Sequence, residues 1–156
     1  MTSLLENNNL VGVIPEEIKA LTGLELLDLS DNKLERSLPT EMPENLKELD
    51  VERNLLQGNP FNSVANLGGS LEALKVSSNF MTGTIPASIS QLTGLTALWM
   101  AENRFEGVIP TEVGLLTNLG TFAMLAKILF NLFVAITYPL LCLFWLQTLF
   151  TRTPIK

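Results

Sequence analysis

The amino-acid sequence predicts a solenoid of stacked repeats followed by a separate apolar segment. Three observations predict this arrangement: an asparagine recurs at nearly constant spacing, apolar residues two apart precede four of the five asparagines, and the C-terminal part contains a long run without charge. With 156 residues, the chain has room for one domain. We therefore predict a repeat domain over residues 1–124 and a membrane segment with a short basic tail over residues 125–156.

The repeat unit is marked by asparagines that lie 24, 22, 25 and 24 residues apart. The surrounding residues follow the pattern L-x-x-L-x-L-x-x-N-x-L, followed in most units by Gly and by an apolar residue before Pro. The marker asparagines are Asn8, Asn32, Asn54, Asn79 and Asn103.

The pattern has a physical explanation. Apolar residues two apart, such as Leu27 and Leu29, lie on one face of a short strand, so one face is core and the other is free. An asparagine amide buried where the chain turns inward can make up to four hydrogen bonds to loop backbone groups. We therefore predict that the asparagine ladder is structural. Because no single coil closes a core, the coils must stack on one another.

These residues resemble leucine-rich repeats of the plant-specific class, whose hallmark is L-x-x-L-x-L-x-x-N-x-L-x-G-x-I-P, and the match covers about residues 4–124. The resemblance implies an α/β solenoid: a right-handed superhelix with a parallel β-sheet on its concave face and short 3₁₀ or helical turns on the opposite side. It also implies a recognition module, as in receptor-like kinases, receptor-like proteins and inhibitors of secreted hydrolases.

The chain departs from the hallmark in several places. Arg36 stands where Gly is expected, the 22-residue unit carries Met42 and Pro43 in a shortened return path, and Pro60 replaces the Ile. We expect a distorted third coil. The paired-cysteine caps usual in plant-type ectodomains are missing, and the sequence starts in the middle of a unit. We therefore expect an N-terminally incomplete member of the family.

The C-terminal part predicts a transmembrane helix. Residues 128–150 are 23 residues without a charge, and a helix of that length spans about 34 Å, enough to cross a hydrocarbon core of about 30 Å. Lys127 precedes the run, whereas Arg152 and Lys156 follow it, so the positive-inside rule weakly places the repeats outside the cytoplasm. We expect a single-pass protein of the plasma membrane or endomembranes. Insertion as a tail anchor would instead leave the repeats cytosolic.

Two alternatives remain for this segment. A long buried helix could pack on the last coil, although a run without a polar face has no solvent side. The reading frame could also leave a normal repeat gene near residue 125, because Lys127 stands where the next asparagine is due. The protein would then be a soluble scaffold or hydrolase-inhibitor-like protein, or an incomplete fragment, with an artefactual tail.

The residues between the core leucines predict a binding face. In the implied fold they lie on the concave side, and they change from acidic to aromatic along the chain. The acidic region suits basic or polyhydroxylated ligands, while Trp99, beside Ala97 and Ala101, has the composition of an interface anchor. The alternative is that these charges only keep a solvated face soluble. The candidate ligand contacts are Asp28, Asp50, Glu52, Arg53, Lys75, Trp99 and Glu102.

Composition excludes several functions. The chain has no His and one Cys, which excludes imidazole catalysis and a cysteine-rich zinc site, and its net charge of -6 disfavours nucleic acid. Neighbouring carboxylates on an open, wet sheet lack the differing environments that acid–base catalysis requires. We therefore expect a non-enzyme without cofactor or metal that binds a protein, peptide or glycan. A signalling co-partner would be needed, because no kinase domain follows Phe150.

Overall fold

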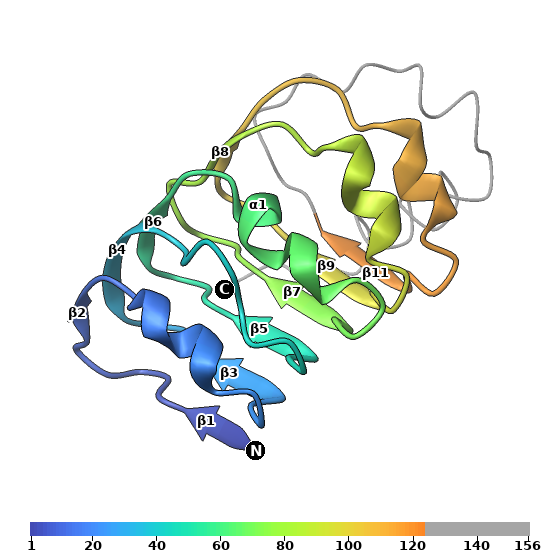
Figure 1. Ribbon diagram of the computed structural model, residues 1–156. Helices are drawn as coiled ribbons and strands as arrows, with labels where there is room; N and C mark the ends of the chain where they lie inside the picture. Colours follow the sequence, from blue (N-terminus) through green and yellow to red (C-terminus); the bar gives the residue numbers. More distant parts are fainter. Residues whose placement is uncertain (124–156) are drawn as a thin grey trace, which may run out of the picture.

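The computed structural model describes residues 1–123, which form a stack of coils. The predicted membrane segment at 128–150 lies outside the described residues. Each coil contributes one short strand to a six-stranded sheet in which all neighbours are parallel, so the predicted parallel sheet is confirmed (Figure 1). In spatial order the strands are β1 (Thr2–Leu4), β3 (Leu26–Asp28), β5 (Glu48–Asp50), β7 (Ala73–Lys75), β9 (Ala97–Trp99) and β11 (Thr121–Ala123).

Equivalent repeat positions form continuous rows across this sheet, because the strands pair in register. The middle residues of the inner strands are register partners and are buried in the core: Leu27, Leu49, Leu74 and Leu98. Since side chains alternate along a strand, the residues on either side of each leucine point to the opposite face. We call this opposite face of the six-stranded sheet the sheet face.

A second set of short strands follows the asparagines. After each turn the chain runs alongside the equivalent segment of the neighbouring coil, forming a three-stranded parallel sheet and a separate two-stranded one. These strands are β2 (Val11–Gly12), β4 (Lys33–Ser37), β6 (Leu55–Gln57), β8 (Thr82–Gly83) and β10 (Arg104–Phe105).

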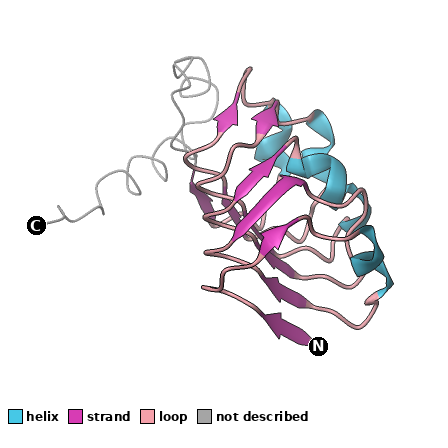
Figure 2. Ribbon diagram, turned by 90° about the vertical axis from the view of Figure 1, so that its left-hand side faces the viewer, coloured by secondary structure: helices cyan, strands magenta, loops and turns pink. Residues whose placement is uncertain are grey.

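Short helices occupy the return paths, on the other side of the coils from the six-stranded sheet (Figures 1 and 2). Three 3₁₀ helices follow the apolar–Pro pairs, because proline fixes φ near the value at which the chain enters the helix. They are η1 (Glu16–Ala20), η3 (Ala87–Gln91) and η4 (Thr111–Leu115), and they follow Pro15, Pro86 and Pro110. Within residues 1–123, no helix is both long and apolar enough to cross a membrane.

Two return paths differ from the others, whereas the departures from the hallmark led us to expect one distorted coil. Residues 38–47, in the 22-residue unit, contain no helix. In the next unit, Pro60 starts the α-helix α1 (Pro60–Val64), which leads into the 3₁₀ helix η2 (Ala65–Leu67). The Asn59 side chain caps α1 by accepting a hydrogen bond from the Phe61 amide at 3.0 Å, and proline at the first helical position lacks only a donor that would be unpaired there.

Arg36 adopts the backbone conformation of the glycine that it replaces. Its φ is 67°, and the glycines at the equivalent position of other units have φ between 76° and 91°. The left-handed region costs a residue with a side chain about 1–2 kcal/mol. The neighbouring coils therefore impose this turn on the chain even where the sequence does not favour it.

The core lies between the six-stranded sheet and the return paths. Apolar residues at the first, fourth and sixth positions of the pattern are stacked there coil upon coil, and the leucines at the first position are fully buried: Leu24, Leu46, Leu71 and Leu95. Each fully buried leucine contributes about 1.5–3 kcal/mol relative to an exposed one. The core fixes the position of each strand and so the residues that the sheet face presents.

Candidate ligand-binding face

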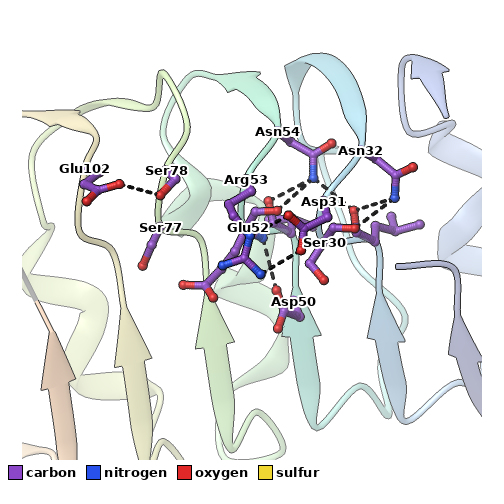
Figure 3. A network of polar contacts seen from close by, with 12 residues as sticks. Ser30, Asp31, Asn32, Asp50, Glu52, Arg53, Asn54, Ser77, Ser78 and Glu102 are labelled. Atoms are coloured by element: carbon purple, nitrogen blue, oxygen red, sulfur yellow. Dashed lines mark hydrogen bonds and ion pairs between the residues drawn. The ribbon is translucent and has the colours of Figure 1, made fainter. Parts of the chain in front are cut away.

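The asparagine ladder fixes the point at which each strand leaves the sheet. The Asn54 amide nitrogen donates to the carbonyls of Leu29 at 2.9 Å, Val51 at 3.2 Å and Glu52 at 3.2 Å. Its carbonyl oxygen accepts from the Leu34 amide of the preceding coil at 2.9 Å. One buried side chain therefore makes four hydrogen bonds and joins two coils (Figure 3). Asn32, Asn79 and Asn103 make equivalent bonds.

Asn8 differs from the other predicted members of the ladder. Its side chain is exposed and donates only to the carbonyls of Leu5 and Glu6, within its own coil. No backbone amide among residues 1–123 donates to its carbonyl oxygen, since its coil is the first of the described stack. The ladder therefore has four members with equivalent hydrogen bonds, of which Asn32, Asn54 and Asn79 are buried and Asn103 is half-buried.

The residue before each ladder asparagine adopts a left-handed backbone conformation, with φ between 52° and 55°. This repeated turn places a row of side chains along the edge of the sheet face, where the strands end (Figure 3). We call this row the rim: Asp31, Arg53, Ser78 and Glu102.

Rim side chains are paired between neighbouring coils. The Arg53 guanidinium donates to both carboxylate oxygens of Asp31, with Nε–Oδ1 at 2.6 Å and the second bond at 2.7 Å. The Ser78 hydroxyl donates to Glu102 at 2.7 Å. The bond from Arg53 lowers the pKa of Asp31. The predicted ligand contacts Arg53 and Glu102 therefore already have partners. The column alignment could have revealed the first pair, because Asp31 and Arg53 carry opposite charges and lie 22 residues apart.

A central row of side chains crosses the sheet face, with acidic residues at one end and an aromatic residue at the other. Asp28, Asp50, Lys75 and Trp99 are register partners on successive strands. The Lys75 ammonium donates to Glu48 and lies 3.5 Å from a carboxylate oxygen of Asp50. It also lies 5.8 Å from the centroid of the Trp99 ring, within range of a cation–π interaction. Lys75 thus connects the acidic and the aromatic parts of the row.

Asp50 and Glu52 are more covered than the sequence led us to expect. Each residue is only 8 % exposed. Burial raises the pKa of Asp50, and the nearby carboxylates of Asp28 and Glu52 add to this, whereas the Glu52 amide, which donates to Asp50 at 3.1 Å, and Lys75 oppose it. Asp28 accepts from the amide and hydroxyl of Ser30 at 2.9 and 2.7 Å.

Trp99 provides the aromatic end of the row. It ends β9, and its side chain remains 38 % exposed. Ala97 and Ala101 lie two residues to either side on the same face of the chain, so small side chains flank the ring. A large aromatic surface with small neighbours is the residue composition of an interface anchor.

The arrangement is suited to binding. Among residues 1–123, no group of three or more His, Cys, Asp or Glu side chains is placed to hold a metal ion. The sheet face combines covered carboxylates, one lysine and a half-exposed tryptophan on a rigid sheet, which is how a preorganised interface presents its contacts.

The chain is similar in sequence to known repeat proteins. The Leucine Rich Repeat family matches residues 23–44, 45–67 and 70–92. Among curated proteins, the chain is similar to Receptor-like protein 18 of Arabidopsis thaliana, with 39 % identity over 92 residues. The match covers 59 % of this chain but 11 % of that protein, so the chain spans about a ninth of the relative's length.

Solved structures of plant receptors have the same fold. The ectodomain of the Arabidopsis thaliana receptor kinase HAESA, solved with a peptide hormone ligand, IDA, is 35 % identical, with a TM-score of 0.72 over 78 % of this chain and 21 % of that one. A chain of the Arabidopsis thaliana BIR3–SERK2 complex is 34 % identical, with a TM-score of 0.66 over 81 % of this chain and 70 % of that one. Taken with the repeat pattern and the asparagine ladder, these similarities show that the chain belongs to the leucine-rich repeat family and has the repeats of plant receptor ectodomains.

Proposed function

We propose that the repeats are part of the ligand-binding region of a receptor-like protein and bind a protein or peptide on the sheet face. The observation that carries this proposal is the central row, which ends at the half-exposed Trp99 beside Lys75. The HAESA ectodomain, which has the same fold, was solved with a peptide hormone ligand. Trp99 would be the anchor, because hot spots are enriched in tryptophan flanked by residues that exclude water.

We also propose that residues 128–150 anchor the repeats in a membrane as a single helix. The charge-free run in the sequence supports this proposal, as does the similarity to a protein named receptor-like. The charges flanking the run favour repeats outside the cytoplasm. Signalling would then pass through a second membrane protein, and the BIR3–SERK2 complex shows that two proteins can associate in a structure that contains this fold.

The binding proposal is tested by selecting peptides from a displayed random library on the full-length chain and measuring their affinity for variants. Trp99→Ala should weaken the binding of the selected peptides by about 2 kcal/mol, because the contact area of the ring is lost. Phe80→Ala is the matched control. Phe80 is 39 % exposed and contacts Arg104 by a cation–π interaction, but it follows a ladder asparagine and lies outside the sheet strands. Equal losses for both variants would rule out the anchor role of Trp99.

The anchor proposal is tested by alkaline carbonate extraction of membranes that contain the full-length chain. An inserted helix should keep the protein in the membrane pellet, because carbonate removes peripheral proteins only. Replacing Leu140 and Phe144 by arginine places two charges within the run, each costing about 2.5–3.5 kcal/mol on insertion. This variant should move to the soluble fraction. Recovery of the unmodified chain in the soluble fraction would overturn the proposed anchor.

A further inference from the structure

We propose that Lys75 is a positioning residue, which holds the Trp99 ring in place for the ligand and does not bind the ligand itself. This inference rests on the proposed function, in which Trp99 is the anchor, and it describes how the sheet face keeps that anchor ready. The sequence predicts Lys75 as a ligand contact, so the inference gives this residue a different role.

Lys75 lies between the acidic and the aromatic residues of the central row. Its register partners are Asp50 on β5 and Trp99 on β9. Because neighbouring strands are about 4.8 Å apart, its long side chain can reach both partners. The Lys75 ammonium lies over the Trp99 ring, 5.8 Å from the centroid, within the range of a cation–π contact. Among residues 1–123, no other cation lies over this ring.

Two carboxylates hold the lysine at the ring. The Lys75 ammonium donates to Glu48 and lies 3.5 Å from a carboxylate oxygen of Asp50. An ammonium has three donors, so the two carboxylates and the ring can occupy all of them. Burial disfavours the charged form, but the hydrogen bond to Glu48 and the charges of both carboxylates outweigh burial and raise the pKa of Lys75. Only 24 % of the side chain is exposed, which leaves little of it for a ligand.

The restraint matters because the ring has few other supports on the sheet face. Trp99 is half-exposed and ends β9, and its neighbours on the same face of the chain, Ala97 and Ala101, have short side chains. A free lysine samples many rotamers and could not restrain the ring, whereas one fixed by two carboxylates can. A side chain that is already held in its bound conformation avoids an ordering cost on binding.

The strand on the other side of Trp99 leaves the ring open to a ligand. On β11, the register partners of Ala97 and Trp99 are Thr121 and Ala123. Both have short side chains, so neither competes with a ligand for the ring. The Lys75 ammonium already occupies the cation site of the ring and would repel a second positive charge. The ligand group at the ring should therefore be apolar and approach from the β11 side.

The first test measures the motion of the Trp99 ring in the full-length chain without ligand. The Trp145→Phe variant leaves Trp99 as the only tryptophan, and its fluorescence anisotropy decay reports ring motion on the nanosecond timescale. Lys75→Met keeps the apolar stem but removes the charge, so it should add a fast component to the decay and raise quenching by acrylamide. Lys75→Arg keeps a cation that bonds carboxylates and stacks on aromatic rings, and it should preserve the slow decay.

Two further variants assign the effect to the contacts of Lys75. Lys19→Met removes a lysine that Glu41 holds at 3.1 Å; it belongs to η1, on the other side of the coils from the sheet face, and the substitution should leave ring motion unchanged. Glu48→Gln weakens the hold on Lys75 from β5, two strands from Trp99, and should add a smaller fast component. Glu48→Gln also decides the question where Lys75→Met does not fold.

The second test measures the affinity of a library peptide selected on the full-length chain. Lys75→Met should weaken its binding about three- to tenfold, the usual cost of ordering one mobile side chain. In the Trp99→Ala background, Lys75→Met should cause no further loss, because no ring remains to be held. A lysine that contacted the peptide directly would still contribute in that background.

The outcomes separate this inference from the function on which it rests. Ring motion that Lys75→Met and Glu48→Gln both leave unchanged overturns the inference, even where Trp99→Ala weakens binding and so supports the binding face. An equal loss of affinity from Lys75→Met with and without the Trp99 ring also overturns it, because Lys75 would then be a ligand contact. A peptide affinity that Trp99→Ala leaves unchanged overturns the proposed function instead. Faster ring motion in Lys75→Met, with a loss of affinity only where the ring is present, supports the inference.

Discussion

Asn54 shows how a single polar side chain holds neighbouring coils together. It bonds three carbonyls and one amide that turn inward where the strand ends, and it shares the Leu29 and Val51 carbonyls with Asn32 and Asn79. Asn8 occupies the same position of the repeat but is exposed and bonds only within its own coil. The same residue type thus has different energetic importance, depending on whether a coil lies on either side.

Asn54→Ala should destabilise the protein by about 3–5 kcal/mol, because the buried Leu34 amide loses its partner at about 1–3 kcal/mol and three carbonyls each lose one hydrogen bond at about 0.5–1.5 kcal/mol. Asn8→Ala should change the unfolding free energy by less than about 1 kcal/mol, as is usual at the surface. Urea denaturation of the full-length chain, followed by circular dichroism, measures both. Similar destabilisation by the two substitutions would contradict the role assigned to the buried ladder.

Asp50 makes stability depend on pH. Because burial raises its pKa above the unfolded value, the folded state binds a proton more tightly than the unfolded state does. Stability is therefore highest below the unfolded value near 4 and is lost as pH rises through the raised pKa. Asp50→Asn keeps the acceptor for the Glu52 amide and removes the loss of stability that accompanies rising pH. The variant should be more stable than the parent chain at pH 7, and its advantage should shrink toward about pH 4.

Denaturation of both proteins across this pH range checks the prediction. Glu17→Gln, at an exposed position, serves as the control for the general effect of removing a negative charge. An advantage of Asp50→Asn that grows as the pH falls would show that the sign of the shift is wrong.

At the scale of elements, close contact between return paths limits which residues the turns accept. Gly94 lies in the turn that leads into β9, and a Cβ atom there would be 2.1 Å from the Gly69 carbonyl oxygen and 3.1 Å from that of Leu71. Both neighbours are backbone atoms, which cannot rotate away. Gly23 occupies the equivalent position, nine residues before its ladder asparagine, and has no atom within 4 Å of such a Cβ.

Gly94→Ala should therefore destabilise the protein by about 2–3 kcal/mol, the usual cost of forcing extra volume into a packed site. Gly23→Ala should be neutral or slightly stabilising, since alanine restricts the unfolded chain. Thermal denaturation of the two variants distinguishes a tight contact between coils from a general need for glycine in this turn. Equal effects would indicate that the turn conformation alone is responsible.

At the scale of the whole molecule, the sequence predicted the elements that repeat and missed those that depend on neighbours. The leucine and asparagine columns gave the parallel sheet and its register, because both follow from spacing within one unit. The pairing of Arg53 with Asp31 and the approach of Lys75 to Asp50 join side chains of different coils. These contacts arise only when coils of different sequence are stacked, so a single unit does not specify them.

The exposure of Asn8 is a similar case. The repeat pattern makes it equivalent to the other four asparagines, but its environment depends on which coil lies beside it. Local pattern therefore predicts conformation well, whereas burial and charge pairing belong to the assembled stack. The candidate binding face combines both: its rows come from the pattern, and its chemistry comes from the contacts between rows.

The most direct test of the binding face is the fluorescence of Trp99 during ligand titration. The chain has two tryptophans, and the Trp145→Phe variant leaves Trp99 as the only one. A peptide selected on the full-length chain should shift Trp99 emission to shorter wavelength and protect it from acrylamide quenching, because the ring becomes covered. Saturating binding of that peptide with unchanged emission and unchanged quenching would show that the ligand binds away from the sheet face.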